Sequence, residues 1–272
     1  MSQLQVESHK ESISHIPIQP QVQYHPSLRG HFEKFRAGNE LHLMIRALRK
    51  LAATEKNYED LTLLSQLEYD EGNYTDCLKC IDLALEVRGR ELKGLQLLYR
   101  LRGACLIQVG LLDQAEDSLY EALEHPGETD QVLVNMGTLD IQRKSWESAT
   151  VSFREAITYN SKNDKAWVGL ALCHRFRGDH ELAFGNLELA LDISPKNETA
   201  LGLLLAWYGD KKEVSVQHRL LTYLLDGGEN ENLWLAFIEL SSRRGETRIA
   251  RMELERLRLT HPHFVPAYQK RV

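Results

Sequence analysis

One pattern of residues repeats along the sequence with a period of 34, and this period limits the fold more than any other feature. The pattern is clearest between Asp164 and Asn197. In its first half, residues that can be buried recur at intervals of three and four, the spacing of one helix face: Trp167, Leu170, Ala171 and His174. Gly178 follows this run and favours the end of a helix. The first half therefore predicts a helix that stops at a glycine.

The second half of the pattern predicts a second helix, packed against the first. Four of its residues are expected to point inward: Leu182, Ala183, Leu187 and Ala190. Pro195 is expected to end this helix, because proline has no amide hydrogen to donate and its ring clashes with the preceding turn. The short side chains of Ala171 and Ala183 allow the two helices to approach closely. Each copy of the pattern thus predicts a helical hairpin.

Six copies of the pattern are visible in the chain. The copy one period earlier has these residues at the equivalent positions: Leu133, Met136, Gly137, Lys144, Ala149, Phe153 and Ala156. An insertion near Leu92 to Leu95 separates the first copy from the second, and the second helix of the fifth copy is less regular. Because one hairpin cannot bury its apolar face alone, six in register predict a stacked array.

This pattern of small and large residues resembles that of the tetratricopeptide repeat proteins, from about Tyr58 to Phe264. The resemblance implies an all-α fold, a right-handed superhelical solenoid of helix-turn-helix repeats. The expected repeats are 58–91, 96–129, 130–163, 164–197, 198–230 and 231–264, within 58–264. Residues 27–57 are expected to form a helical N-terminal cap or a degenerate repeat, and 265–272 a truncated C-terminal capping segment. Residues 1–26 are expected to be an extended or disordered tail, either loose or lying along a groove of this protein or of a partner.

Composition excludes several classes of protein. The net charge of −6 and the pI near 6.0 give no attraction toward nucleic acid or anionic membrane. No signal peptide or membrane-spanning run of about 18 apolar residues is visible, so a cytoplasmic protein is expected. The four cysteines, Cys77, Cys80, Cys105 and Cys173, are expected to be reduced thiols in helices.

No motif for catalysis is present in the sequence. It has no GxxxxGK[ST] phosphate loop, no HExxH metal pair and no GxSxG nucleophile turn. We expect no catalytic residue, no cofactor and no metal site, the histidines His261 and His263 included. The expected function is that of a non-catalytic adaptor or scaffold. Two alternatives stay open: a regulatory subunit that controls an NTPase or kinase in trans, and an RNA-binding helical repeat, which the acidic charge disfavours.

The resemblance also implies where a partner would bind. In tetratricopeptide repeat proteins the first helices line a concave groove, and the matching positions here indicate Arg100, Gln131, Asn135, Thr138, Lys165, Val168, Leu172 and Arg175. Some members clamp the carboxyl terminus of heat-shock chaperones with five side chains. Arg100, Asn135 and Lys165 match three of them, but Ala104 and Gly169 replace the other two, which argues against that specificity. An acidic or carboxylate-bearing peptide or helical segment of another protein remains the expected ligand. The alternative is that Asn135 orders the backbone and the two cations are merely solvated.

Two stretches of opposite charge form a second candidate surface. Between Gly103 and Gln142 there are eight acidic residues and no Lys or Arg, and the last repeat is rich in arginine. The candidate patch residues are Asp113, Glu116, Asp117 and Glu121, and Arg243, Arg244, Arg248 and Arg251. They form either solvated faces or sites for head-to-tail self-association.

Overall fold

The computed structural model describes residues 28–38 and 40–262 of the chain. These residues form fourteen α-helices, and the chain divides into two units, Met1–Thr54 and Glu55–Val272. The expected N-terminal tail, the segment 265–272 and His263 lie outside the described residues. In the first unit, α1 (Leu28–Ala37) and α2 (Leu41–Thr54) pack on each other and bury Phe32, Leu48 and Leu51. This unit is helical, and its role as a cap or degenerate repeat stays a prediction.

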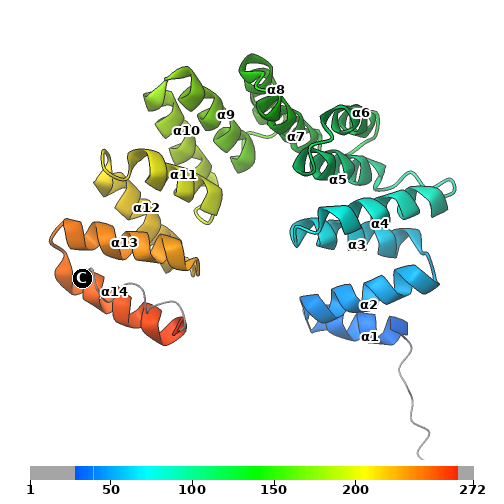
Figure 1. Ribbon diagram of the computed structural model, residues 1–272, viewed down its shortest axis with the longest axis horizontal. Helices are drawn as coiled ribbons and strands as arrows, with labels where there is room; N and C mark the ends of the chain where they lie inside the picture. The colour runs from blue at the N-terminus through cyan, green and yellow to red at the C-terminus, as the bar shows by residue number, and fades with distance from the viewer. Residues whose placement is uncertain (1–27, 39, 263–272) are drawn as a thin grey trace, which may run out of the picture. The chain divides into compact units, whose positions relative to one another are not determined.

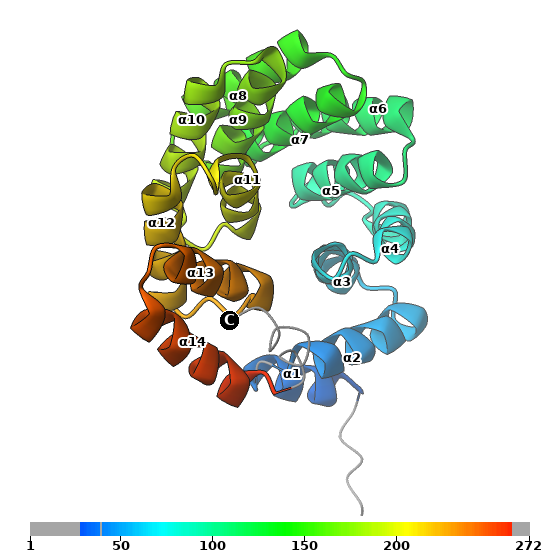
Figure 2. The same ribbon diagram turned by 60° about the vertical axis from the view of Figure 1, so that its left-hand side comes forward.

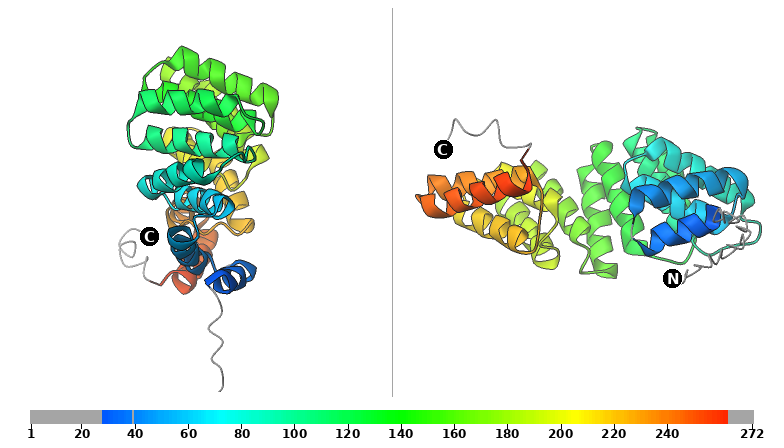
Figure 3. Two further views of the ribbon diagram at one scale, coloured as in Figure 1. Left: turned by 90° about the vertical axis from the view of Figure 1, so that its right-hand side faces the viewer. Right: turned by 90° about the horizontal axis from the view of Figure 1, so that it is seen from below.

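The second unit consists of consecutive helical hairpins (Figure 1). The helices are α3 (Tyr58–Asp70), α4 (Tyr74–Val87), α5 (Leu95–Gln108), α6 (Leu112–Leu123), α7 (Thr129–Gln142), α8 (Trp146–Tyr159), α9 (Asp164–Arg177), α10 (His180–Ile193), α11 (Glu198–Tyr208), α12 (Glu213–Leu225), α13 (Glu231–Arg243) and α14 (Thr247–Thr260). Within this unit, α3, α5, α7 and α11 lie on the inner side of a curve and α4, α6, α10 and α12 on the outer side (Figure 2). Neighbouring first helices also contact each other, as α5 and α7 do, and α7 and α9 (Figure 3). The predicted helical solenoid is therefore confirmed.

In the described part of the second unit, the turn inside five of the six hairpins explains the glycine of the repeat. One residue there has a left-handed backbone, with φ of +82° at Gly110 and +86° at Gly178. In the third hairpin the same place is taken by Lys144, whose φ is +61°. A side chain at such a φ is strained. The position is thus set by the backbone, and the lysine adopts the conformation that glycine takes elsewhere.

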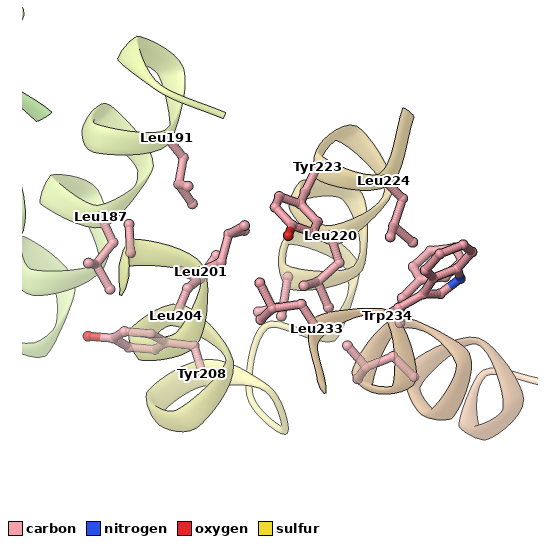
Figure 4. Close-up of a cluster of buried hydrophobic side chains, with 14 of the residues drawn as sticks. Leu187, Leu191, Leu201, Leu204, Tyr208, Leu220, Tyr223, Leu224, Leu233 and Trp234 are labelled. Carbon is pink, nitrogen blue, oxygen red and sulfur yellow. The ribbon is translucent and has the colours of Figure 1, made fainter. Parts of the chain in front are cut away.

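Small residues let the helices of a hairpin approach. A Cβ atom added to Gly103 would lie 2.6 Å from Leu119, and one added to Gly137 would lie 2.7 Å from the ring of Phe153. The apolar core runs between the hairpins, and Figure 4 shows part of its largest cluster, which links helices α9 to α14. The predicted inward residues Leu187 and Ala190 belong to this cluster, and Ala183 is buried as well.

One predicted core residue is wrong. Leu182 is 56% exposed, because the buried face of α10 runs through Ala183, Leu187 and Ala190. Successive residues of a helix are rotated by about 100° about its axis, so the residue next to a buried one can lie at the edge of the buried face and be exposed. Two adjacent apolar residues therefore left the inward one ambiguous.

A ladder of side-chain hydrogen bonds joins the later hairpins, and it was not predicted from the sequence. Asn163 Nδ2 donates to Asp130 Oδ2 over 2.8 Å, and Asn197 Nδ2 donates to Asp164 Oδ2 over 2.8 Å. Asn230 Nδ2 donates to Glu198 Oε2 over 2.8 Å. Each asparagine also caps the helix that follows it with its side-chain oxygen. One residue type thus starts a hairpin and fastens it to the previous one.

Candidate partner-binding groove

A cavity of about 760 Å³ lies on the inner faces of α5, α7 and α9, next to the start of α11. This volume falls within the range of about 300–1,000 Å³ that is usual for ligand sites. Its lining divides into an apolar floor and a polar rim. The floor consists of Ala104, Ile107, Val134, Ile141, Phe153, Val168, Gly169 and Leu172. The rim includes Tyr69, Arg100, Gln131, Asn135, Thr138, Asp164, Lys165, Lys196 and Asn197.

Positive charge dominates the rim. Arg100, Lys165 and Lys196 come from α5, α9 and the loop before α11, and none of them forms an ion pair with the described residues. The carboxylate in the lining, Asp164, is already engaged, because its Oδ2 accepts the hydrogen bond from Asn197. The cavity therefore presents three cations that attract an anionic group, and one carboxylate, hydrogen-bonded to an amide, that repels it.

The polar groups between these cations are partly committed to the backbone. Asn135 Nδ2 lies 3.4 Å from the carbonyl oxygen of Arg100, to which it donates, and Thr138 Oγ1 donates to the carbonyl of Val134 over 2.9 Å. The backbone-ordering role considered for Asn135 is thus present. Burial raises the pKa of the Tyr69 phenol, and Arg100 opposes this shift, so the phenol is a neutral hydrogen-bond donor near pH 7.

The centre of the floor is an aromatic ring from an outer helix. Phe153 of α8 reaches between Gly137 of α7 and Gly169 of α9, and its side chain is only 1% exposed. A Cβ atom on Gly169 would overlap this ring. The absence of a side chain at Gly169 therefore leaves room both for the ring and for the hollow above it.

Seven of the eight residues predicted for the groove line this cavity: Arg100, Gln131, Asn135, Thr138, Lys165, Val168 and Leu172. Arg175 lies outside it, with its guanidinium carbon 5.5 Å from the centroid of the Trp207 ring and a contact to His180. Lys196 and Phe153 were missed, because the prediction used first helices alone. Lys196 lies in the loop that ends a repeat, directly before the first helix of the next one. This position in the sequence could have indicated that Lys196 lies near the groove.

The charged patches are partly used inside the array. Arg143, one residue beyond the acidic stretch, pairs with Glu116 over 2.7 Å and with Asp113 over 2.8 Å. Arg243 pairs with Asp210 over 2.7 Å, and Arg244 pairs with Glu246 over 3.2 Å. Four of the eight predicted patch residues, Asp113, Glu116, Arg243 and Arg244, therefore already have partners within the array.

The other four patch residues are exposed. Glu121 lies 3.5 Å from His125, and its neighbour Asp117 is on the same helix, α6. In the described part of the chain, Arg248 and Arg251 of α14 form no ion pair. Apart from the contact of Glu121 with His125, these four residues are the part of the two predicted patches that forms no ion pair with the residues that the structure describes.

The predicted cysteines are free thiols. Cys77, Cys105 and Cys173 are buried, and Cys80 is half-buried. A hydrogen bond with the Cys105 thiol and burial raise the pKa of the Cys77 thiol, and burial raises the pKa of Cys173. Raised pKa values keep thiols protonated and unreactive.

The described residues contain neither a metal-binding cluster nor a membrane-spanning helix. Across 28–38 and 40–262, no group of three or more His, Cys, Asp or Glu side chains is placed to hold a metal ion. No helix in the same residues has the length and apolar character needed to cross a membrane.

Comparison with known proteins supports the fold. No family model matches the sequence. A curated relative, the BBSome complex member BBS4 of Bos taurus, is 25% identical over 111 residues, which are 40% of this chain. The chain spans only 21% of the length of that relative.

Solved structures give longer matches at low identity. A tetratricopeptide repeat protein from Parabacteroides merdae ATCC 43184 matches with a TM-score of 0.53 and 18% identity, over 84% of this chain and 90% of that one. The structure of the APC/C hetero-tetramer Cut9-Hcn1 matches with a TM-score of 0.59 and 14% identity, over 78% of this chain and 42% of that one. Pseudomonas aeruginosa PilF matches with a TM-score of 0.54 and 17% identity, over 76% and 92% of the two chains. The predicted resemblance is confirmed at the level of structure: this chain has the fold of a tetratricopeptide repeat protein.

Proposed function

We propose that this protein is a non-catalytic adaptor that binds a segment of another protein in the cavity between α5, α7 and α9. The observation that carries the proposal is the set of three cations, Arg100, Lys165 and Lys196, around one cavity of about 760 Å³ without an ion-pair partner among the described residues. A structural role would ordinarily pair such charges, as Arg143 and Arg219 are paired elsewhere in the array.

An acidic segment fits this cavity energetically. A hydrogen bond between a charged donor and a carboxylate contributes about 1.5–3 kcal/mol, more than a neutral one. Charges at the rim also speed the encounter with an oppositely charged partner. Contacts with the apolar floor supply the buried area on which most affinity depends.

The names of two similar proteins point in the same direction. One is a member of the BBSome complex and another is part of an APC/C hetero-tetramer. Both names describe subunits of assemblies, which supports a scaffold role for this chain as well.

The experiment is affinity capture from cell extract with matched variants. Wild type is compared with Arg100→Glu/Lys165→Glu, and with a control, Arg154→Glu/Lys162→Glu, which reverses two exposed cations outside the cavity. Partners captured by wild type and by the control, but at least tenfold depleted from the cavity variant, are expected. Equal capture by all three proteins, with unchanged melting temperatures, would remove the cavity from consideration.

Self-association is a second candidate, because exposed Asp117 and Glu121 on α6 have charges opposite to exposed Arg248 and Arg251 on α14. Such a pairing would be head-to-tail and would weaken with salt. It concerns a different surface from the cavity, so the two proposals are independent.

A further inference from the structure

Two of the five clamp positions in this cavity carry no donor side chain. At the two positions where the chaperone-tail clamp would place an asparagine and a cation, this protein has Ala104 and Gly169. Both belong to the apolar floor, and Ala104 is 4% exposed. A terminal carboxylate pressed against this floor would lose its water without gaining hydrogen bonds, which is unfavourable.

The floor is suited to an apolar side chain instead. Leu172 is half-buried at its edge, and Val168, Val134 and the ring of Phe153 lie around Gly169. An apolar group above Gly169 would be removed from water on all these sides. The ring cannot give way to a larger residue at position 169, because a Cβ atom there already overlaps it.

The cations lie on both sides of this floor and come from different helices. Arg100 is on α5 and Lys165 on α9, with α7 packed between them. Packed helix axes lie roughly 8–10 Å apart, so the axes of α5 and α9 are separated by at most about 16–20 Å. An extended segment advances about 3.3 Å per residue, and about five residues cover that separation. Two carboxylates within a short segment can therefore meet one cation each.

We infer that the cavity recognises an internal segment of a partner protein in which acidic residues stand on both sides of one apolar side chain, with no requirement for a free carboxyl terminus. This inference rests on the proposed function. The apolar side chain enters the floor above Gly169, and the acidic residues meet Arg100 on one side and Lys165 and Lys196 on the other.

The test begins with two random 12-residue peptide libraries selected on the purified full-length protein. In one library the peptide is internal to its carrier, and in the other it has a free carboxyl terminus. The internal library is expected to yield peptides with Asp or Glu on both sides of a recurring Leu, Ile, Met or Phe. Enrichment from the free-terminus library alone, or acidic peptides without a recurring apolar residue, would overturn the inference.

The strongest peptide is then synthesised as a free acid and as a carboxyl-terminal amide. Their dissociation constants, measured by fluorescence anisotropy, are expected to agree within about twofold. Tighter binding of the free acid by tenfold or more would mean that the cavity holds a chain end. Replacing the recurring apolar residue of the peptide by serine is expected to weaken binding at least tenfold, and unchanged binding would refute insertion into the floor.

Protein variants separate this inference from the proposed function. Leu172→Gln alters the floor, and Leu189→Gln makes the same change at an exposed leucine of α10 outside the cavity. Leu172→Gln is expected to weaken the parent peptide at least tenfold but the serine peptide hardly at all, and Leu189→Gln to affect neither. If Leu172→Gln does not fold, the serine peptide still tests the floor from the other side.

The rim variant Lys165→Gln, with Lys162→Gln as its control, tests the proposed function itself. Selected peptides that need Lys165 but ignore the floor would leave the proposed function standing and overturn the inference. Peptides that bind wild type and Lys165→Gln equally, or no enrichment from either library, would overturn both.

Discussion

Asn197 couples the stability of the array to the charge of the cavity, and its replacement gives the sharpest prediction. Its Oδ1 accepts a hydrogen bond from Ala200 N over 2.9 Å and caps α11, and its Nδ2 donates to Asp164 Oδ2 over 2.8 Å. Loss of an N-cap costs about 1 kcal/mol. Loss of a hydrogen bond to a charged group costs about 1.5–3 kcal/mol when the group is buried, and less here because Asp164 is only half-buried. Asn197→Ala is therefore expected to lower the free energy of unfolding by about 2–3 kcal/mol.

Asn197→Ser separates the two contributions, because serine keeps an oxygen for the cap but is too short to reach Asp164 in the same way. A loss of about 1–2 kcal/mol is expected for serine. Asn232→Ala serves as the control, since Asn232 is an exposed residue and such substitutions change stability by less than about 0.5 kcal/mol. The assay is urea denaturation followed by circular dichroism.

The same substitution has a consequence for binding. Without Asn197, the Asp164 carboxylate in the cavity lining keeps its negative charge but loses the amide dipole that partly offsets it, so it repels an acidic ligand more strongly. Asn197→Ala and Asn197→Ser are both expected to weaken an acidic peptide by threefold or more. If Asn197→Ala unfolds at the same urea concentration as Asn232→Ala, the ladder contributes nothing measurable and the reasoning is wrong.

Further predictions concern other parts of the array. Lys144→Gly is expected to stabilise the protein by about 0.5–1 kcal/mol, measured by urea denaturation. A left-handed backbone costs a residue with a side chain about 1–2 kcal/mol, and the larger conformational entropy that glycine loses on folding offsets part of the gain. An unchanged urea midpoint would contradict this. Gly137→Ala is expected to destabilise by about 1–3 kcal/mol, since the new Cβ atom would lie 2.7 Å from the Phe153 ring; a stability equal to wild type would mean that the helices part freely. Burial raises the pKa of Asp140, so the contribution of this residue to stability is largest when it is protonated and is lost as the pH rises through its folded pKa. Asp140→Asn is therefore expected to raise the urea midpoint near pH 7 but not near pH 3. Equal effects at both pH values would refute this reasoning. The α6 and α14 patches are expected to give salt-sensitive self-association in sedimentation velocity, and a monomer at low salt would exclude it.

The repeating part of the structure could be predicted because its causes repeat in the sequence. Close helix approach requires a small residue at a fixed place, and Gly103, Gly137 and Ala171 supply it. The left-handed turn requires a residue that tolerates positive φ, and glycine marks it in most hairpins. Where two residues satisfied the same requirement, as Leu182 and Ala183 did, the spacing alone could not choose between them.

The cavity could be predicted only in part. Side chains of first helices repeat their orientation with the period, so Arg100, Asn135 and Lys165 were found together. Phe153 reaches the floor from an outer helix because two glycines leave a gap, and this depends on three helices at once. The paired acid and asparagine at the two ends of a repeat, as in Asp164 and Asn197, were visible in the sequence and were not interpreted.

The hydrogen bond between Asn197 and Asp164 affects both ligand binding and the stacking of two hairpins. Asp164 and Asn197 belong to successive hairpins, and both line the cavity. When these hairpins are stacked, Asn197 holds the carboxylate of Asp164, and the three cations of the rim face the ligand with little opposition. When they separate, the carboxylate loses this donor, and Lys196 moves away together with its loop. A ligand that needs the full set of cations thus binds the stacked form better than the separated form, and by linkage it stabilises stacking to the same extent. The stacked hairpins are consequently expected to position the residues of the cavity, and a bound ligand is expected to stabilise their stacking.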